Sequence, residues 1–255
     1  MRERISDTSW EGVGKWYEGC VGKEGHYYHK QVIFPKLLPL LGLQEGNSLL
    51  DLACGEGIFS RVMPKGVSYQ GIDLSPALVQ AAKAKAKRGV KFTVGDICSP
   101  LPFPKDAFTH AVCILALQNV AHPEKTLEHA ASLLVPGGTL VLVLNHPCFR
   151  IPRQSSWGVD EEKKIQYRRI DRYLSPLKIP IEMAPGKGKK SPSTWSFHHS
   201  LSDYSQMLKK GGFLIEEIEE WTSDKKSTGK NARMENRSRS EFPLFLTLKA
   251  RKASR

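Results

Sequence analysis

The sequence lacks the features that mark membrane, secreted and zinc-binding proteins. No stretch approaches the roughly 20 apolar residues of a membrane span, and the first ten residues have no apolar core of the signal-peptide type. The five cysteines are scattered without a C-x-x-C pair, which favours neither a disulfide framework nor a zinc site. We see no acidic cluster for a metal ion and expect none. These absences predict a cytoplasmic protein without a membrane span, and they leave its oligomeric state open.

The chain is basic, with a net charge of +12. Such a charge favours contact with a polyanion or an acidic substrate. Much of the excess lies in residues 225–240, a Gly- and Ser-containing run between two strand-like segments, which we interpret as a solvated, mobile loop. We therefore keep nucleic acid as an alternative partner and favour a small molecule.

The most informative stretch is LLDLACGEGIFS, residues 49–60. It predicts a buried strand with Asp51 near its end, a turn with Gly55 and Gly57, and the start of a helix. Glycine is needed where the backbone approaches a ligand closely or takes positive φ, so this order of elements indicates a nucleotide-binding corner. A dinucleotide fingerprint would have a third glycine where Ser60 stands, which argues against NAD or FAD.

Strand and helix signals alternate regularly from residue 48. We expect strands at residues 48–53, 67–73, 90–96, 108–117, 139–145, 213–221 and 241–250. Ser75 with Pro76, and Ser200 with Asp203, have the spacing of helix N-termini. We expect the intervening helices from about residue 58, after residue 75, over 122–135 up to the Pro-Gly-Gly turn, and after residue 200. Such alternation favours an α/β fold with a parallel sheet that binds ligands at the carboxyl ends of its strands.

Two segments stand outside this alternation. Residues 1–46 mix aromatics with glycines and then give an apolar helical run, where Pro35 and Pro39 predict two short helices that form a cap or flap. Residues 146–199 are longer than an ordinary connection, so we interpret them as a lid and substrate platform. We expect a single domain over 1–255, with a ligand-binding half at 47–145 and the last helix and two strands at 200–250.

Three acids lie at the ends of successive expected strands: Asp51, Asp73 and Asp96. Together with the glycine turn they resemble the motifs of class I S-adenosylmethionine (SAM) dependent methyltransferases. The segments NHPCFR, TWSFHH and ENRSRSEFPLFLTLKA resemble a bacterial subgroup akin to the small-molecule, ubiquinone and menaquinone methylases. The resemblance implies a seven-stranded, mostly parallel, doubly wound Rossmann-like sheet with an antiparallel last strand. It also implies SAM as cofactor and S-adenosylhomocysteine as product.

The resemblance also assigns roles to residues around the cofactor. It implies that Asp51 orders the glycine loop near the ligand's amino group, that Asp73 accepts from the ribose hydroxyls, and that Asp96 and Ile97 contact adenine. It implies that the N-terminal segment closes over SAM. The cofactor-binding residues that we expect are Asp51, Ala53, Cys54, Gly55, Gly57, Asp73, Leu74, Asp96, Ile97, Leu115, Tyr17, Tyr28 and His29.

The acceptor side is less determined by the sequence. A neutral histidine suits the removal of a proton near pH 7, and His146 is the first candidate for the base, followed by His198 and His199. The residues that we expect to contact substrate are Gln118, Asn119, Trp157, Tyr167 and Arg168. Asn145 to Phe149 is similar to the N-P-P-[YF] motif of amino-methyltransferases, but it stands after the wrong strand and lacks the proline pair.

The sequence thus predicts a SAM-dependent methyltransferase that acts on a small aromatic or anionic molecule. The alternatives are an RNA or protein methyltransferase that uses its basic surface, a SAM-binding protein without catalysis and, more distantly, an NAD oxidoreductase.

Overall fold

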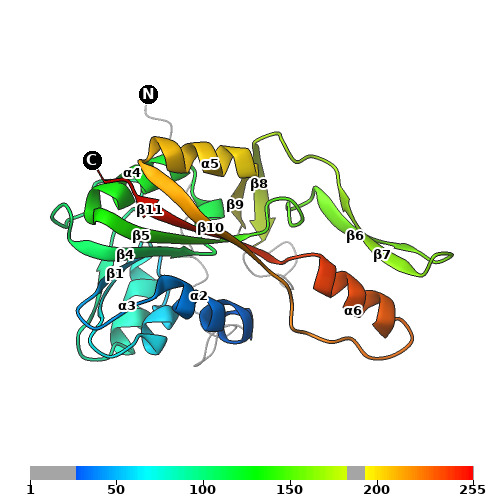
Figure 1. Ribbon diagram of the computed structural model, residues 1–255, viewed down its shortest axis with the longest axis horizontal. Coiled ribbons are helices and arrows are strands. Elements are labelled where there is room, and N and C mark those ends of the chain that lie inside the picture. Colours follow the sequence, from blue (N-terminus) through cyan, green and yellow to red (C-terminus); the bar gives the residue numbers. More distant parts are fainter. Residues whose placement is uncertain (1–26, 183–192, 255) are drawn as a thin grey trace.

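The computed structural model describes residues 27–182 and 193–254, which are built around one seven-stranded sheet (Figure 1). Its strands follow the order β10-β11-β5-β4-β1-β2-β3. Neighbours from β5 to β3 pair in parallel, whereas β11 pairs antiparallel with both β5 and β10. The expected sheet with an antiparallel last strand is confirmed. The strands are β1 (Ser48–Leu52), β2 (Ser68–Asp73), β3 (Val90–Val94), β4 (Phe108–Ile114), β5 (Leu134–Asn145), β10 (Phe213–Trp221) and β11 (Phe245–Lys252).

The central strands are buried on both faces, as their nearly continuous apolar sequences predict. In β4, Ala111, Val112 and Cys113 are all fully buried. Because side chains alternate along a strand, Ala111 and Cys113 join the apolar cluster on one face of the sheet, and Val112 joins the cluster on the other.

Helices cover both of these faces (Figure 1). The helical elements are η2 (a π-helical turn, His29–Ile33), α2 (Phe34–Leu41), η3 (3₁₀, Ile58–Val62), α3 (Pro76–Ala84), η4 (3₁₀, Leu117–Asn119), α4 (Pro123–Leu133), α5 (Leu201–Lys210) and α6 (Ala232–Glu241). The Ser75 hydroxyl accepts from the Leu78 amide, and Ser200 forms a capping box with Asp203, so both expected helix starts are confirmed. Within the described residues, no helix has the length and apolar character needed to cross a bilayer.

Two local expectations about helices were wrong. The N-terminal run is not divided at its prolines: helical structure continues from η2 through α2. Pro35 lies in the first turn of α2, where its missing amide is tolerated, and the amide of Phe34 bonds to His29 O in π-helical geometry. After the glycine turn only the short 3₁₀ helix η3 forms. Pro64 favours extended backbone at Met63, which has ψ 136°.

The segment after β5 forms two hairpins, β6 (Ser155–Asp160) with β7 (Ile165–Ile170) and β8 (Leu177–Glu182) with β9 (Ser193–His198). The prediction of a mobile loop at 225–240 was also wrong, because this segment contains most of α6. The Ser238 hydroxyl donates to Gln166 O at 3.0 Å, which ties α6 to β7. Figure 1 shows β6, β7 and α6, which we call the arm, projecting together from one end of the sheet.

Candidate cofactor and acceptor site

The turn after β1 takes left-handed backbone at three residues, Ala53 (φ 59°), Gly55 (φ 56°) and Gly57 (φ 71°). A Cβ at Gly57 would lie 2.4 Å from Cζ of Phe92, so the second glycine is required for packing against β3. A Cβ at Gly55 would meet nothing within 4 Å. The first glycine therefore leaves the loop backbone open on the side where a ligand can approach.

Asp73, the last residue of β2, holds this turn in place. Its carboxylate accepts the amide of Gly55 at 2.8 Å and the amide of Ser75 at 2.9 Å. One side chain thus fixes the glycine turn after β1 and the start of α3 after β2. We had expected Asp51 to order the loop, and the structure shows this contact from Asp73.

Asp51 is almost completely buried, and its carboxylate accepts a hydrogen bond from the Tyr69 hydroxyl. Burial raises the pKa of Asp51 to about 7; the bond from Tyr69 opposes this rise, and the negative charge of Asp73 adds to it. The carboxyl group is therefore poised to ionise near neutral pH. A cationic ligand beside it would favour the ionised form.

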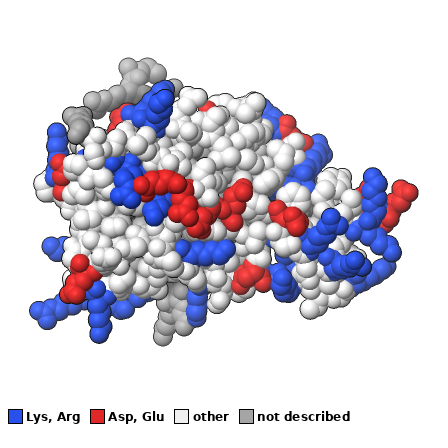
Figure 2. All heavy atoms as spheres, in the orientation of Figure 1, with Lys and Arg blue, Asp and Glu red and all other residues white. Residues whose placement is uncertain are grey.

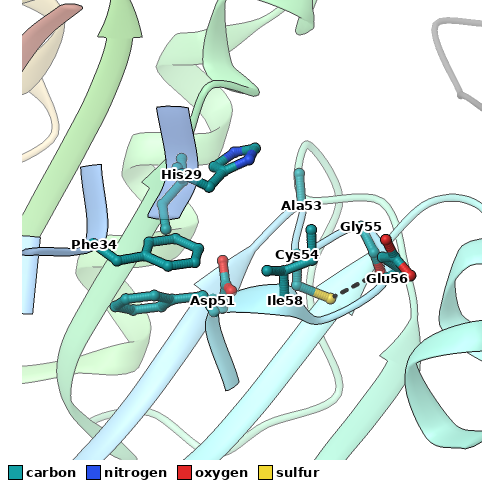
Figure 3. A pocket seen from close by; sticks show the side chains of 10 residues that line it. His29, Phe34, Asp51, Ala53, Cys54, Gly55, Glu56 and Ile58 are labelled. Atoms are coloured by element: carbon teal, nitrogen blue, oxygen red, sulfur yellow. Dashed lines mark hydrogen bonds between the residues drawn. The ribbon is translucent and has the colours of Figure 1, made fainter. Parts of the chain in front are cut away.

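A pocket lies over this turn at the carboxyl edge of the sheet. Figure 3 shows the Asp51 carboxylate in its middle, between the ring of Phe34 and the side chains of Cys54 and Ile58, with His29 above. The lining residues are His29, Phe34, Asp51, Ala53, Cys54, Gly55, Glu56, Ile58, Phe59 and Ile114. The N-terminal helical segment thus closes one side of a pocket whose floor is the glycine turn.

Glu56 is a pocket residue that sequence reasoning missed. Its side chain is fully buried, and Oε2 accepts from Lys85 Nζ at 2.8 Å and from Arg61 Nη2 at 3.4 Å. Oε1 is buried and has no hydrogen-bond partner within the described part of the chain. An acid between the two glycines was the signal in the sequence. The two cations bonded to Oε2 compensate the charge of Glu56, so the carboxyl group of the lining that can balance a positively charged ligand is that of Asp51.

The end of β4 forms a second strained turn beside the first, because β4 is the neighbour of β1. Leu115 has φ 53°, and its carbonyl accepts from Gln118 Nε2 at 2.8 Å. Gln118 is 8% exposed, and its Oε1 is buried without a partner in the described ranges. Strained backbone and an unsatisfied hydrogen-bond acceptor lie together at this sheet edge. They mark the turn as a candidate binding site for a substrate.

The three other residues expected at the cofactor after β2 and β3 differ in solvent exposure and in hydrogen bonding. Leu74, directly after Asp73, is 42% exposed, whereas Ile97 is buried in the core. The Asp96 carboxylate accepts from the amide of Cys98 and the hydroxyl of Ser99 within its own turn.

The three residues before β1 that we expected at the cofactor also differ in position. His29 lines the pocket, while Tyr28 is not in its lining and packs its ring against Phe245. Tyr17 lies outside the described residues.

The three candidate histidines differ in their free ring nitrogens. In His146, Nδ1 accepts the amide of Cys148 at 3.2 Å, so Nε2 carries the proton and donates to Glu220 Oε1 at 2.6 Å. Both nitrogens of this buried ring are occupied, which leaves none for a substrate. His198 Nε2 donates to Tyr173 O at 2.6 Å.

His199 is placed differently. Its Nε2 is buried and has no hydrogen-bond partner in the part of the chain that the structure describes. Burial lowers its pKa, and the negative charge of Asp203 opposes this effect. It directly follows β9, which packs on η4, the turn that carries Gln118 and Asn119. The fold therefore brings His199, a candidate base, into one region with Gln118 and Asn119, which we expected to contact substrate.

The other expected substrate residues, Trp157, Tyr167 and Arg168, lie on β6 and β7 of the arm and are not in the lining of the pocket. Arg168 stacks over the Trp157 ring at 5.0 Å and donates from Nε to Phe149 O at 2.6 Å. The Trp157 ring also packs edge-on against Phe242. The stacking on Trp157 joins β6 and β7 within the arm, and the bond to Phe149 O ties the arm to the turn after β5.

Comparison with known proteins agrees with this geometry. Residues 50–142 match the family model described as a methyltransferase domain. Demethylmenaquinone methyltransferase of Tropheryma whipplei (strain Twist) is 34% identical over 110 residues, covering 42% of this chain and 46% of that protein. Ubiquinone biosynthesis O-methyltransferase of Coxiella burnetii (strain RSA 493 / Nine Mile phase I) is 31% identical over 100 residues, covering 38% of this chain and 42% of the relative. This chain thus matches less than half the length of either relative.

A solved structure is similar over more of the chain. An S-adenosylmethionine dependent methyltransferase from Mesorhizobium loti has a TM-score of 0.68 and 28% identity, covering 86% of this chain and 96% of that one. The protein has the fold of the class I SAM-dependent methyltransferases. Residues 50–142 are similar to a methyltransferase domain, and these similarities imply SAM as the cofactor.

Proposed function

We propose that the protein transfers the methyl group of SAM to a small aromatic or anionic acceptor. The observation that carries this proposal is the pocket at the carboxyl ends of β1 and β4, where Asp51 faces a glycine turn that Asp73 holds in place. The likeness to methylases named for quinone synthesis supports a small acceptor.

The residues of the pocket fit SAM, whose sulfonium and amino groups are cationic. Asp51 supplies a carboxyl group in the lining that ionises near neutral pH, and the open side of Gly55 lets the backbone approach the ligand. Asp73 at the end of β2 would stand beside the ribose. When bound, SAM supplies an activated methyl group, so the protein has only to orient the acceptor, exclude water and accept a proton.

We assign binding of the methyl acceptor to Gln118 and removal of its proton to His199. Gln118 Oε1 would accept a hydrogen bond from the acceptor, which satisfies an otherwise unpaired buried oxygen. The lowered pKa of His199 keeps its imidazole neutral near pH 7, and Nε2 would take the proton that the acceptor loses. His146 then positions the end of β5 through Glu220.

A second candidate function is methylation of RNA, which the arm favours. Figure 2 shows Lys and Arg side chains gathered at the end of the molecule that carries the arm, and acidic side chains in a band over β10. Trp157 and Tyr167 on the arm are 42% and 48% exposed, and exposed aromatic rings among cations are a platform for unpaired bases.

One experiment separates these functions. The purified protein is incubated with SAM labelled in the methyl group and with cell extract, and the label is then sorted into small molecules, RNA and protein. Label in small molecules supports the proposal, and label in RNA supports the second candidate. No transfer by a protein that binds SAM would contradict both.

A further inference from the structure

Arg150 is a partly buried cation that has no counter-ion within the described residues. It follows β5 in a helical turn in which its amide bonds to His146 O at 2.8 Å. The turn places Arg150 at the carboxyl edge of the sheet, where this fold binds its ligands. Across the described ranges, no hydrogen bond or salt bridge joins its guanidinium to another residue. The position therefore combines burial, positive charge and free donors.

The residues in electrostatic range of Arg150 include Tyr28 and a second cation, Arg168. Burial lowers the pKa of its guanidinium, and Tyr28 opposes that effect. The positive charge of Arg150 in turn lowers the pKa of Arg168, although burial contributes more. Lys225 Nζ lies 5.1 Å from the centre of the Tyr28 ring, and the nearby Asp224 is bonded to the hydroxyl of Tyr27. Arg168 thus lies within electrostatic range of Arg150, and no carboxylate of the described residues influences the pKa of Arg150.

Arg168 is not equivalent to Arg150. Its Nε donates to Phe149 O at 2.6 Å and its Nη2 to Ser155 Oγ at 2.9 Å, which commits its guanidinium to the arm. The guanidinium of Arg150 makes no such bond to any residue that the structure describes. Withdrawing a charged group from water without a partner is unfavourable. A bound anion would recover that cost, and the planar guanidinium matches the two oxygens of a carboxylate or phosphate.

We propose that Arg150 binds the carboxylate or phosphate group of the methyl acceptor. This inference rests on the proposed function, because it identifies the acceptor as an anion. Tyr28, which opposes the lowering of the Arg150 pKa by burial, directly precedes His29 in the wall of the cofactor pocket. The anionic end of the acceptor would therefore lie against Arg150 and Tyr28, while its other end reaches toward the cofactor pocket.

The test compares Arg150→Gln with Arg153→Gln. Arg153 lies three residues further on and is exposed, so the control removes the same charge from the same segment. Binding of inorganic phosphate and, separately, of 4-hydroxybenzoate is measured by calorimetry at constant ionic strength set with chloride. We expect the wild type to bind at least one probe, Arg150→Gln to lose at least tenfold in affinity, and Arg153→Gln to keep it. The probe that binds distinguishes a phosphate from a carboxylate acceptor.

Two further measurements keep the outcomes distinct. We expect the melting temperature of Arg150→Gln without ligand to equal or exceed that of the wild type, because an unpaired charge is removed; a fall of several degrees would indicate a structural role and overturn the inference. Equal probe affinity in both variants, or no binding by the wild type, would overturn it as well. SAM affinity, measured on the same three proteins, should not change. A wild type that fails to bind SAM contradicts the proposed function, whereas SAM binding with no effect at Arg150 contradicts only this inference.

Discussion

The carboxylate of Asp73 accepts the backbone amide of Gly55 at 2.8 Å, across the carboxyl ends of two neighbouring strands. The contact joins the acid that ends β2 to the turn that follows β1. It gives the glycine turn its shape before any ligand arrives, which lowers the cost of ordering the loop on binding.

The two glycines of this turn should respond differently to alanine. Gly57→Ala places a Cβ 2.4 Å from the Phe92 ring at φ 71°, so we expect a loss of about 2 to 4 kcal/mol in the free energy of unfolding. Gly55→Ala meets no atom within 4 Å and should cost only about 1 kcal/mol, from its positive φ. Urea unfolding of both variants measures this difference. Equal losses would contradict the separate roles given to the two residues.

Asp51 should make stability depend on pH. Its folded pKa of about 7 lies above the roughly 3.9 of an unfolded aspartate, so folding favours its protonated form. This contribution is complete below about pH 4 and is lost as pH rises toward 7. We expect the unfolding free energy of the wild type, relative to Asp51→Asn, to fall by a few kcal/mol across that range.

Urea unfolding at four pH values between 4 and 8 tests this expectation, with Asp106→Asn as a surface control. If the difference in unfolding free energy between wild type and Asp51→Asn stayed constant with pH, burial would not raise the pKa of Asp51.

His146 and His199 should separate stability from catalysis. His146→Ala removes bonds to Cys148 and Glu220 from a buried ring, and we expect it to cost about 1 to 3 kcal/mol of stability. His199→Gln should leave stability nearly unchanged and lower the rate of label transfer by about 10²- to 10⁴-fold. Thermal unfolding and initial rates with labelled SAM measure the two effects. If His146→Ala alone abolished transfer in a stable protein, the assignment of the base would be reversed.

The arm gives the test for the second candidate function. If the arm binds RNA, affinity for a single-stranded oligonucleotide should fall steeply with salt and drop severalfold in Tyr167→Ala, because stacking is lost. Leu214→Ala, at an exposed residue of β10, is the control. We expect from the proposed function that wild-type binding is weak, and that Tyr167→Ala leaves transfer to small molecules unchanged. Fluorescence anisotropy over a salt series distinguishes the two.

Much of the fold could be predicted because its signals are local. Ser75 with Pro76, and Ser200 with Asp203, define helix starts through neighbouring side chains, and apolar runs define strands that are buried on both faces. The helix α6 was missed because its residues are mostly polar. It is stabilised by contacts with β7 that are distant in sequence, such as the bond from Ser238 to Gln166.

The site shows the same division. Motif spacing placed Asp51, Asp73 and Gly55 at one edge, since parallel strands end together. The occupation of both nitrogens of His146 depends on Glu220, 74 residues away. The lack of a partner for Arg150 among the described residues depends on which acids come near it in space. Neither is legible in a linear sequence.

The most direct test of the account is SAM binding measured by calorimetry on wild type, Asp73→Asn and Asp106→Asn. The two carboxylate oxygens of Asp73 accept one amide each, from Gly55 and from Ser75. The asparagine side chain has a single oxygen, so in Asp73→Asn the glycine turn loses a contact that shapes it. We predict that the wild type and Asp106→Asn bind SAM with the same affinity and that Asp73→Asn binds at least tenfold more weakly. Absence of binding by the wild type, or equal affinity in Asp73→Asn, would contradict the account.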